Sequence, residues 1–177
     1  MKPFILLTLT SGIAILCLGW VMGNFEFSSP LFAFLVNWLV MSWVAISGQI
    51  VPFPLPPEAY YAEKPFEKAG WVYEIVGVRI FKSIVRRPPF TLLSPTLKIP
   101  AEKTTSSLQG LQKEMKKAEA GHLFVFFLVL TPALYALLTA QYLGGIWLLF
   151  FNVLFNGYPV MLQRYNRIKL QELIAFQ

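Results

Sequence analysis

Four long stretches of this sequence carry almost no charge, and they constrain its fold more than any other feature. They cover residues 4–22, 31–51, 123–143 and 146–162. A helix needs about 17–25 predominantly apolar residues to cross the hydrocarbon core of a bilayer. We therefore predict an all-α, polytopic membrane protein with four transmembrane helices.

The composition supports a membrane protein of one domain. The chain has 177 residues, of which 56% are hydrophobic and only 14% are charged, whereas a soluble domain has about 25% charged residues. We treat residues 1–177 as a single membrane domain, in which residues 52–122 form a cytoplasmic, partly helical segment between the second and third spans. Lys2 before the first apolar stretch resembles the start of a signal peptide. No small-x-small cleavage site follows, so we expect an uncleaved helix.

The basic residues predict the orientation of the chain. Lys2 lies at the N-terminus, residues 52–122 hold eleven of the fifteen Lys and Arg, and the C-terminal tail carries Arg164, Arg167 and Lys169. Basic residues accumulate on the cytoplasmic side of membrane proteins. We expect a multi-pass protein of the cell membrane with both termini in the cytoplasm.

Charge and cysteine content narrow the possible partners. The net charge of +6 favours anionic headgroups or a phosphate-bearing substrate. The sequence contains no recognised nucleic-acid-binding motif, so we expect no nucleic acid partner. Cys17 is the only cysteine, which allows no thiolate cluster, and we expect no metal site.

The cytoplasmic segment begins with a stretch suited to the membrane surface. "EKPFEKAGWVYEIVGVRIFKSIV" (63–85) mixes aromatic, aliphatic and basic residues, as interfacial helices do. Gly70 and Gly77 are expected to break it into pieces. "RRPPFTLLSPTLKIP" (86–100) holds four prolines and is predicted to be irregular.

The only histidine lies near the membrane end of a predicted helix at residues 106–122, which we expect to continue into the third span. Glu119 and His122 are three residues apart and share its apolar face, so their side chains are neighbours. The pair has two interpretations: the two groups satisfy each other at a helix end, or Glu119 orients His122 as a general base. Imidazole suits the second role because its pKa lies near working pH.

The fourth span carries a polar stripe. Its members fall within roughly 60° of Asn152 on a helical projection: Asn152, Asn156, Pro159, Gln163, Asn166 and Arg167. Unpaired amides in hydrocarbon are costly, so this face should meet protein or a wet cavity. The amides could join helices by hydrogen bonds, or they could line a pocket at the cytoplasmic end, where the stripe reaches Arg164 and Arg167.

A short turn predicted at residues 141–145 makes the third and fourth spans an antiparallel hairpin. Glu119 and His122 would then lie at the same membrane face as the end of the polar stripe. Convergence of two polar sites at one face predicts an active site there.

Three motifs resemble one known family. They are the polar stripe with its "YPVMLQRYNR" end (158–167) followed by Lys169-Leu170, the "EAGH" at 119–122, and "FEKAGWVYEIVGVRIFK" at 66–82. Together they resemble the glycosyl-diaponeurosporenoate acyltransferase family of carotenoid biosynthesis, over residues 61–173.

The resemblance implies transfer of a fatty acyl group to a sugar hydroxyl of a glycosylated carotenoid or related isoprenoid glycolipid. The donor would be acyl-CoA or a similar thioester, used as a co-substrate, with no bound cofactor. In this scheme His122 takes the hydroxyl proton and Glu119 holds its ring. The substrate-binding candidates are Asn152, Asn156, Gln163, Arg164, Asn166 and Arg167. Among them, Asn156 or Gln163 would stabilise an oxyanion, and the arginines would hold a phosphate.

Two other functions remain open. The chain could be a non-enzymatic subunit or assembly factor of a larger membrane complex, or it could bind an isoprenoid lipid without chemistry. An enzyme predicts polar groups around a cavity, a subunit predicts amides buried between helices, and a lipid-binding protein does not need His122. The chain also lacks the His-x-x-x-x-Asp signature of the glycerol-phosphate acyltransferases, because Phe127 stands five residues after His122.

Overall fold

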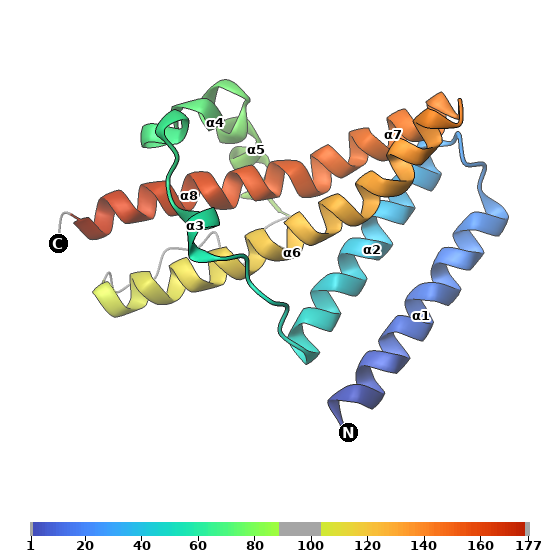
Figure 1. Ribbon diagram of the computed structural model, residues 1–177, viewed down its shortest axis with the longest axis horizontal. Helices are drawn as coiled ribbons and strands as arrows, with labels where there is room; N and C mark the ends of the chain where they lie inside the picture. The colour runs from blue at the N-terminus through green and yellow to red at the C-terminus, as the bar shows by residue number, and fades with distance from the viewer. Residues whose placement is uncertain (1, 89–103, 176–177) are drawn as a thin grey trace. The chain divides into compact units, whose positions relative to one another are not determined.

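The computed structural model describes residues 2–88 and 104–175, and every regular element within them is a helix (Figure 1). Four helices are long and apolar enough to cross a membrane: Pro3–Asn24, Pro30–Ile50, Ser106–Leu138 and Tyr142–Glu172. The predicted all-α class with four such helices is therefore confirmed. The segment predicted to be irregular, residues 86–100, lies mostly outside the described residues.

The chain divides into two compact units, each of which is considered by itself. Unit 1 comprises Met1–Pro54 and Gly121–Gly157, and unit 2 comprises Leu55–Ala120 and Tyr158–Gln177. The prediction of a single domain stays a prediction.

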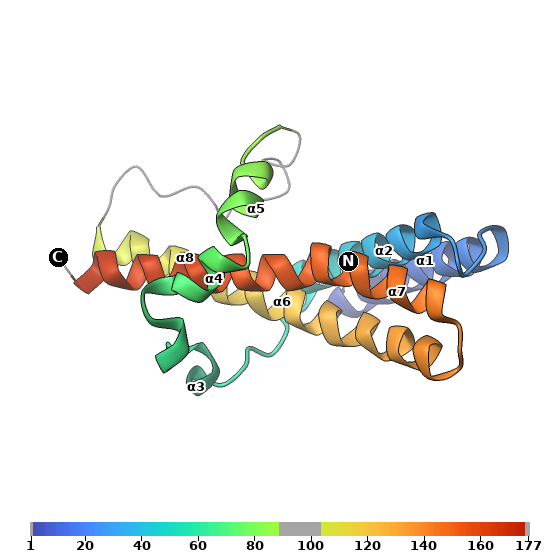
Figure 2. The same cartoon turned by 90° about the horizontal axis from the view of Figure 1, so that it is seen from above.

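Unit 1 is built from long apolar helices. Its elements are α1 (Pro3–Asn24), α2 (Pro30–Ile50), the C-terminal part of α6 (Thr105–Leu138), α7 (Tyr142–Asn152) and a π-helical turn (Val153–Gly157). α1 runs beside α2, as both Figure 1 and Figure 2 show. The Ser29 hydroxyl caps α2 by accepting from the Leu31 amide at 3.1 Å, as hydroxyls at this position commonly do.

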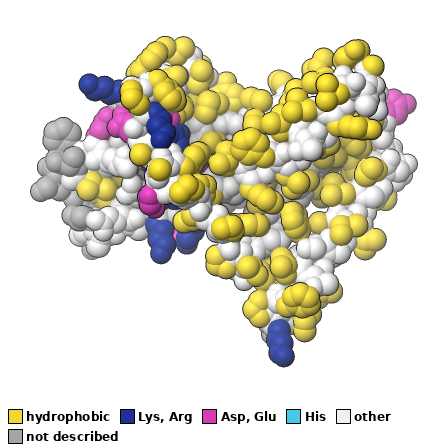
Figure 3. All heavy atoms as spheres, viewed as in Figure 1, with side chains coloured by type: hydrophobic (Ala, Val, Ile, Leu, Met, Phe, Trp, Pro, Cys, Tyr) yellow, Lys and Arg dark blue, Asp and Glu magenta, His cyan; other side chains and the backbone are white. Residues whose placement is uncertain are grey.

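The inner surface of unit 1 is made of small and branched side chains. Its buried core comprises Ala33, Val44, Val125, Val129, Ala133 and Leu148. Large apolar side chains point outward on α1, where Leu16 is 75% exposed, and Figure 3 shows hydrophobic side chains over the visible face of α1 and α2. An outward apolar face is what a helix in lipid presents.

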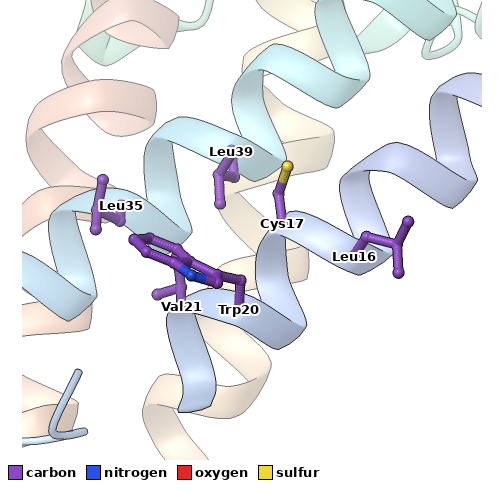
Figure 4. Close-up of a pocket in the computed structure, with 6 residues that line it drawn as sticks. All are labelled: Leu16, Cys17, Trp20, Val21, Leu35 and Leu39. Carbon is purple, nitrogen blue, oxygen red and sulfur yellow. The ribbon is translucent and has the colours of Figure 1, made fainter. Parts of the chain in front are cut away.

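An apolar pocket of about 350 Å³ lies between α1 and α2 (Figure 4). It is lined by Leu16, Cys17, Trp20, Val21, Leu35 and Leu39. The lining holds no charged group, so it offers neither an acid nor a base for chemistry. Cys17 is one of these lining residues.

The turn between the third and fourth spans differs from its prediction at residues 141–145. α6 already ends at Leu138, and Ala140 adopts the positive φ of 62° that closes the turn. Gly144 and Gly145 lie inside α7. A Cβ atom on Gly145 would lie 2.8 Å from Leu137 Cδ2, so this glycine permits close helix packing. The third span therefore ends earlier than expected, and the fourth begins earlier.

Unit 2 combines short helices with two long ones. Its elements are α3 (Glu58–Tyr61), the 3₁₀ helix η1 (Pro65–Gly70), α4 (Trp71–Ile75), α5 (Val78–Val85), the N-terminal part of α6 and α8 (Tyr158–Ala175). Gly70 and Gly77 have φ of 75° and 82°, a conformation that glycine adopts without steric cost. Both predicted breaks are confirmed, and the expected run of the helix at 106–122 into the third span is confirmed by α6.

Two apolar clusters hold unit 2 together. The first comprises Tyr73, Val78, Leu162, Tyr165 and Ile168, and the second comprises Leu108, Met115 and Leu170. They pack α4 and α5 against one part of α8 and the start of α6 against another. The buried polar residues of α8 lie next to these apolar clusters and therefore need hydrogen-bond or charged partners inside unit 2.

Candidate active site

Unit 1 holds His122 in contact with a chain of three asparagines. The imidazole Nδ1 lies 3.3 Å from the side-chain oxygen of Asn156. The Asn156 amide nitrogen donates to the side-chain oxygens of Asn152, at 3.0 Å, and Asn37, at 3.5 Å. These side-chain hydrogen bonds thus link α6, the π-helical turn, α7 and α2.

Backbone carbonyls fix the direction of these hydrogen bonds. The Asn152 amide nitrogen donates to the Phe126 carbonyl at 2.8 Å, and the Asn37 amide nitrogen donates to the Ala33 carbonyl at 2.9 Å. The side-chain oxygens of Asn37 and Asn152 are therefore the groups that accept from Asn156.

This direction determines the tautomer of His122. Because the Asn156 nitrogen is a donor, its oxygen faces the imidazole, and an amide oxygen can only accept. Nδ1 therefore carries the proton in the neutral ring, and Nε2 keeps the free lone pair. A neutral imidazole with its lone pair on Nε2 can act as a general base.

Asn156, the asparagine that contacts His122, lies in the π-helical turn. Pro159 has no backbone N–H, so the Phe155 carbonyl lacks its usual α-helical donor. π-helical turns are rare and often occur at functional sites.

The asparagines are buried, whereas His122 is only partly buried. Asn37, Asn152 and Asn156 are each 0% exposed. The sequence left two interpretations of these amides open: they join helices by hydrogen bonds, or they line a pocket. The contacts of Asn152 and Asn156 agree with the first interpretation. Their predicted contact with substrate stays a prediction, and their burial favours a role in positioning His122.

Unit 2 contains a second polar cluster, made of two arginines and two glutamates. Arg167 Nε donates to Glu119 at 2.9 Å, and Arg164 donates to Glu67 through Nε and, at 2.9 Å, through Nη2. Arg164 Nη1 lies 3.5 Å from Glu119. All four residues are buried, and Glu119 and Arg167 are at most 1% exposed.

Other arginine donors bind the main chain at the C-terminal end of α3. Arg164 donates to the carbonyls of Tyr60, at 3.0 Å, and Ala62, at 3.3 Å, while Arg167 donates to the Tyr61 carbonyl at 3.0 Å. The two guanidinium groups therefore fasten residues 60–62 to α8. This arrangement favours a structural role over the predicted phosphate binding.

The partners of Glu119 differ from those expected. The sequence paired this carboxylate with His122, but Glu119 accepts from Arg164 and Arg167, and the imidazole contacts Asn156. A guanidinium donates two parallel hydrogen bonds to a carboxylate, and such pairs are stronger than a contact with a neutral ring. Glu119 thus belongs to the ion cluster of unit 2.

The direction of the Glu67 pKa shift agrees with an ionised carboxylate beside Arg164. Burial alone would raise the pKa of Glu67, but hydrogen bonds from Arg164 and Tyr73 lower it below its ordinary value. Burial and then the nearby Glu119 carboxylate raise the pKa of Tyr61 to about 12. The Tyr61 hydroxyl is therefore neutral at physiological pH.

The prediction that the polar stripe of the fourth span faces inward is confirmed. Its buried polar residues are Asn152, Asn156, Gln163, Asn166 and Arg167, and Arg164 beside the stripe is buried as well. The stripe is divided between the two units. Asn152 and Asn156 belong to the asparagine cluster of unit 1, whereas the stripe residues from Gln163 onward lie in unit 2. Asn166 accepts from Lys82 Nζ at 2.6 Å.

Sequence reasoning missed Asn37 and Glu67. Asn37 is an amide near the middle of the second apolar span, the same kind of signal that Asn152 and Asn156 give in the fourth span. Glu67 lies within the "FEKAG" of one family motif, but it has acidic and basic neighbours on the chain that make its burial inconspicuous. Its role emerges only from its distant partner, Arg164.

We predict that Arg167→Met lowers the stability of the folded protein by about 3–5 kcal/mol, because it removes a partner from a buried carboxylate. Lys117→Met is the matched control. Lys117 pairs with Glu114 at 2.6 Å, but both side chains are about half exposed, and exposed pairs contribute about 0–1 kcal/mol. Thermal unfolding in detergent measures both variants. Equal melting temperatures would contradict the structural role of the Arg167 pair.

We also predict that the neutral ring of His122 carries its proton on Nδ1. The chain has one histidine, so ¹⁵N-histidine labelling gives a single imidazole whose two nitrogen shifts report the tautomer. Asn156→Ala removes the acceptor and should shift the population toward the Nε2–H form. Thr131→Ala, whose hydroxyl donates only within α6 to the Phe127 carbonyl, should leave the shifts unchanged. An Nε2–H tautomer in the unaltered protein would contradict the proposed direction of the amide chain.

Comparison with known proteins adds the family. Residues 57–176 match the family described as glycosyl-4,4'-diaponeurosporenoate acyltransferase. No curated protein and no solved structure matches the chain. The matched residues are more than half of the 177 and include His122, Asn156 and the whole ion cluster. This chain therefore belongs to the glycosyl-4,4'-diaponeurosporenoate acyltransferase family.

Proposed function

We propose that this protein transfers a fatty acyl group from a thioester donor, such as acyl-CoA, to a sugar hydroxyl of a glycosylated carotenoid or related isoprenoid glycolipid. The observation that carries the proposal is the family match over residues 57–176. Four helices long enough to span a membrane support it, because an acyl chain and a polyene both partition into a bilayer.

The reaction exchanges one carbonyl bond for another. The sugar hydroxyl oxygen attacks the thioester carbonyl carbon, the new C–O ester bond forms, and the C–S bond breaks to release a thiol. The hydroxyl proton must leave as the C–O bond forms, and the departing sulfur must gain one. A single group that accepts and then returns the proton satisfies both requirements.

His122 is the group that we assign to this proton transfer. Its Nε2 would accept the proton from the hydroxyl and return it to the leaving sulfur. The Asn156 oxygen, 3.3 Å from Nδ1, would hold the ring and accept from it throughout. Asn37 and Asn152 would act one step further away, as positioning residues for Asn156.

The other predicted site residues receive different roles in this proposal. Glu119, Arg164 and Arg167 would maintain the fold of unit 2, because their charges are already paired with one another and with Glu67. Acyl transfer would depend on them through stability. Gln163 and Asn166 remain candidates for substrate contact.

A second candidate function is that of a non-enzymatic membrane subunit. The complete burial of Asn37, Asn152 and Asn156 favours it, since amides between helices can serve assembly alone. The two candidates differ in what they require of His122. A subunit needs at most its packing, whereas the enzyme needs its Nε2.

We predict that His122→Ala slows acyl transfer by about 10²–10⁴-fold, the usual contribution of a general base, without loss of folding. The assay uses purified protein in nanodiscs with an acyl-CoA and a glycosylated carotenoid, and melting temperature reports folding. Thr131→Ala, a substitution at an exposed site on the same helix, should retain full turnover.

Two results of this assay would count against the proposal. Near-normal turnover by a folded His122→Ala would exclude the histidine from the chemistry. No turnover by the unaltered protein, together with unchanged acylated pigments in a deletion strain examined by mass spectrometry, would favour the subunit.

We further propose that the protein lies in the cell membrane with both termini in the cytoplasm, from the distribution of Lys and Arg. In a Cys17→Ser background, Ser28→Cys should be labelled by an impermeant maleimide added outside intact cells. Gln177→Cys should be labelled only after the membrane is opened. Labelling of Ser28→Cys only from the cytoplasmic side would reverse the orientation.

A further inference from the structure

Helices α4 and α5 of unit 2 leave a row of large apolar side chains uncovered. Ile75 is 73% exposed, Ile80 69%, Trp71 52% and Ile84 49%. The opposite side of α5 is packed, with Val78, Phe81 and Val85 in the cluster that contacts α8. α5 is therefore anchored on one face and exposes Ile80 and Ile84, four residues apart, on another, and neighbouring exposed apolar residues mark a binding surface.

A basic face lies next to this row on α5. Arg79, Lys82 and Arg86 are spaced three and seven residues apart, which places them within about 60° of one another around the helix. On the same projection Ile80 and Ile84 fall on the neighbouring side. α5 thus has a packed face, an exposed apolar face and a basic face.

The three cations on the basic face are close enough to affect one another. Burial, followed by repulsion from Arg86 and Arg79, lowers the pKa of Lys82. Lys82 Nζ is held by the Asn166 oxygen at 2.6 Å. Arg79 pairs with Glu74 at 3.4 Å, but its side chain is 69% exposed, so the pair is weak. An anionic partner would relieve the repulsion.

We propose that α4 and α5 bind the surface of an anionic bilayer. Trp71, Ile80 and Ile84 would enter the boundary between headgroups and acyl chains, and Lys82 and Arg86 would contact lipid phosphates. Apolar residues beside a basic face are the pattern of helices that lie in the bilayer interface, and anionic lipids attract nearby basic residues.

A bilayer is the occupant best supported by this chain. The same polypeptide carries four helices long enough to span a membrane, so a bilayer is a partner that its composition already favours. A soluble phosphate donor would explain the basic face but not the four exposed apolar side chains. The inference does not depend on acyl transfer and would hold for a membrane subunit as well.

Spin labels on the full-length chain test the apolar face. In a Cys17→Ser background, which removes the only cysteine, Ile80→Cys and Ile84→Cys would carry nitroxides on that face. Ser83→Cys, which is exposed and lies on the basic side, is the matched control. In phosphatidylglycerol nanodiscs, we expect the isoleucine sites to collide more with oxygen than with a water-soluble nickel complex. The Ser83 site should show the reverse, and equal water exposure at all three would overturn the proposal.

Lipid charge tests the basic face. We expect the labels at Ile80 to shift toward water when phosphatidylcholine replaces phosphatidylglycerol, and Arg86→Gln should reduce that shift. Coenzyme A added to phosphatidylcholine nanodiscs separates a soluble phosphate from a lipid headgroup. If coenzyme A alters the labels while lipid charge does not, the basic face binds a soluble phosphate and the bilayer proposal fails. Acyl transfer measured on the same samples is a separate readout.

Discussion

A polar group removed from water needs a partner, and this requirement organises both units. An amide or carboxylate buried without one costs several kcal/mol by rough estimate. In unit 1 the amides of three asparagines satisfy one another and end on backbone carbonyls and on His122. In unit 2 two carboxylates neutralise two guanidinium groups. In both clusters, each buried polar side chain depends on a neighbouring member of the cluster for its hydrogen-bond partner.

The two clusters solve the same problem with different chemistry. A neutral amide chain suits helices that face lipid, because no net charge has to be desolvated. The ion cluster uses stronger bonds but is stabilising only when complete, since the loss of one member strands a buried charge. Its extra donors also hold the carbonyls of residues 60–62. The C-terminal end of the four-residue helix α3 is thereby held against α8.

Much of the fold was predictable because the signals are periodic. Apolar stretches predicted the four long helices, and helical spacing predicted that Asn156 and Arg167 point inward. The hydrogen-bond partners were not predictable, since they join residues distant in sequence. Glu119 was paired with its neighbour three residues away, but its partner Arg167 lies 48 residues further along.

Two other residues show where local reasoning fails. Glycine serves both turns and close packing, so Gly145 was assigned to a turn although it lies inside α7 against Leu137. Asn37 belongs to no polar stripe, so helical spacing does not distinguish it from Ser42, Ser47 and Gln49 of the same span. The family motifs identified the family, but they do not contain Asn37, which precedes the matched residues.

The position of Asn37 bears on how this protein can be divided. The family match begins at residue 57, yet the Asn156 amide that supports His122 also donates to a residue of α2. A shortened protein that kept every matched residue would leave that amide with one side-chain acceptor in place of two. Consider a chimera in which the first two helices come from another family member. It would retain a hydrogen bond from the Asn156 amide only if its second helix carried an acceptor at the position of Asn37. The portion of the chain that matches the family is therefore not a self-contained module, because its histidine is supported in part by a helix outside it.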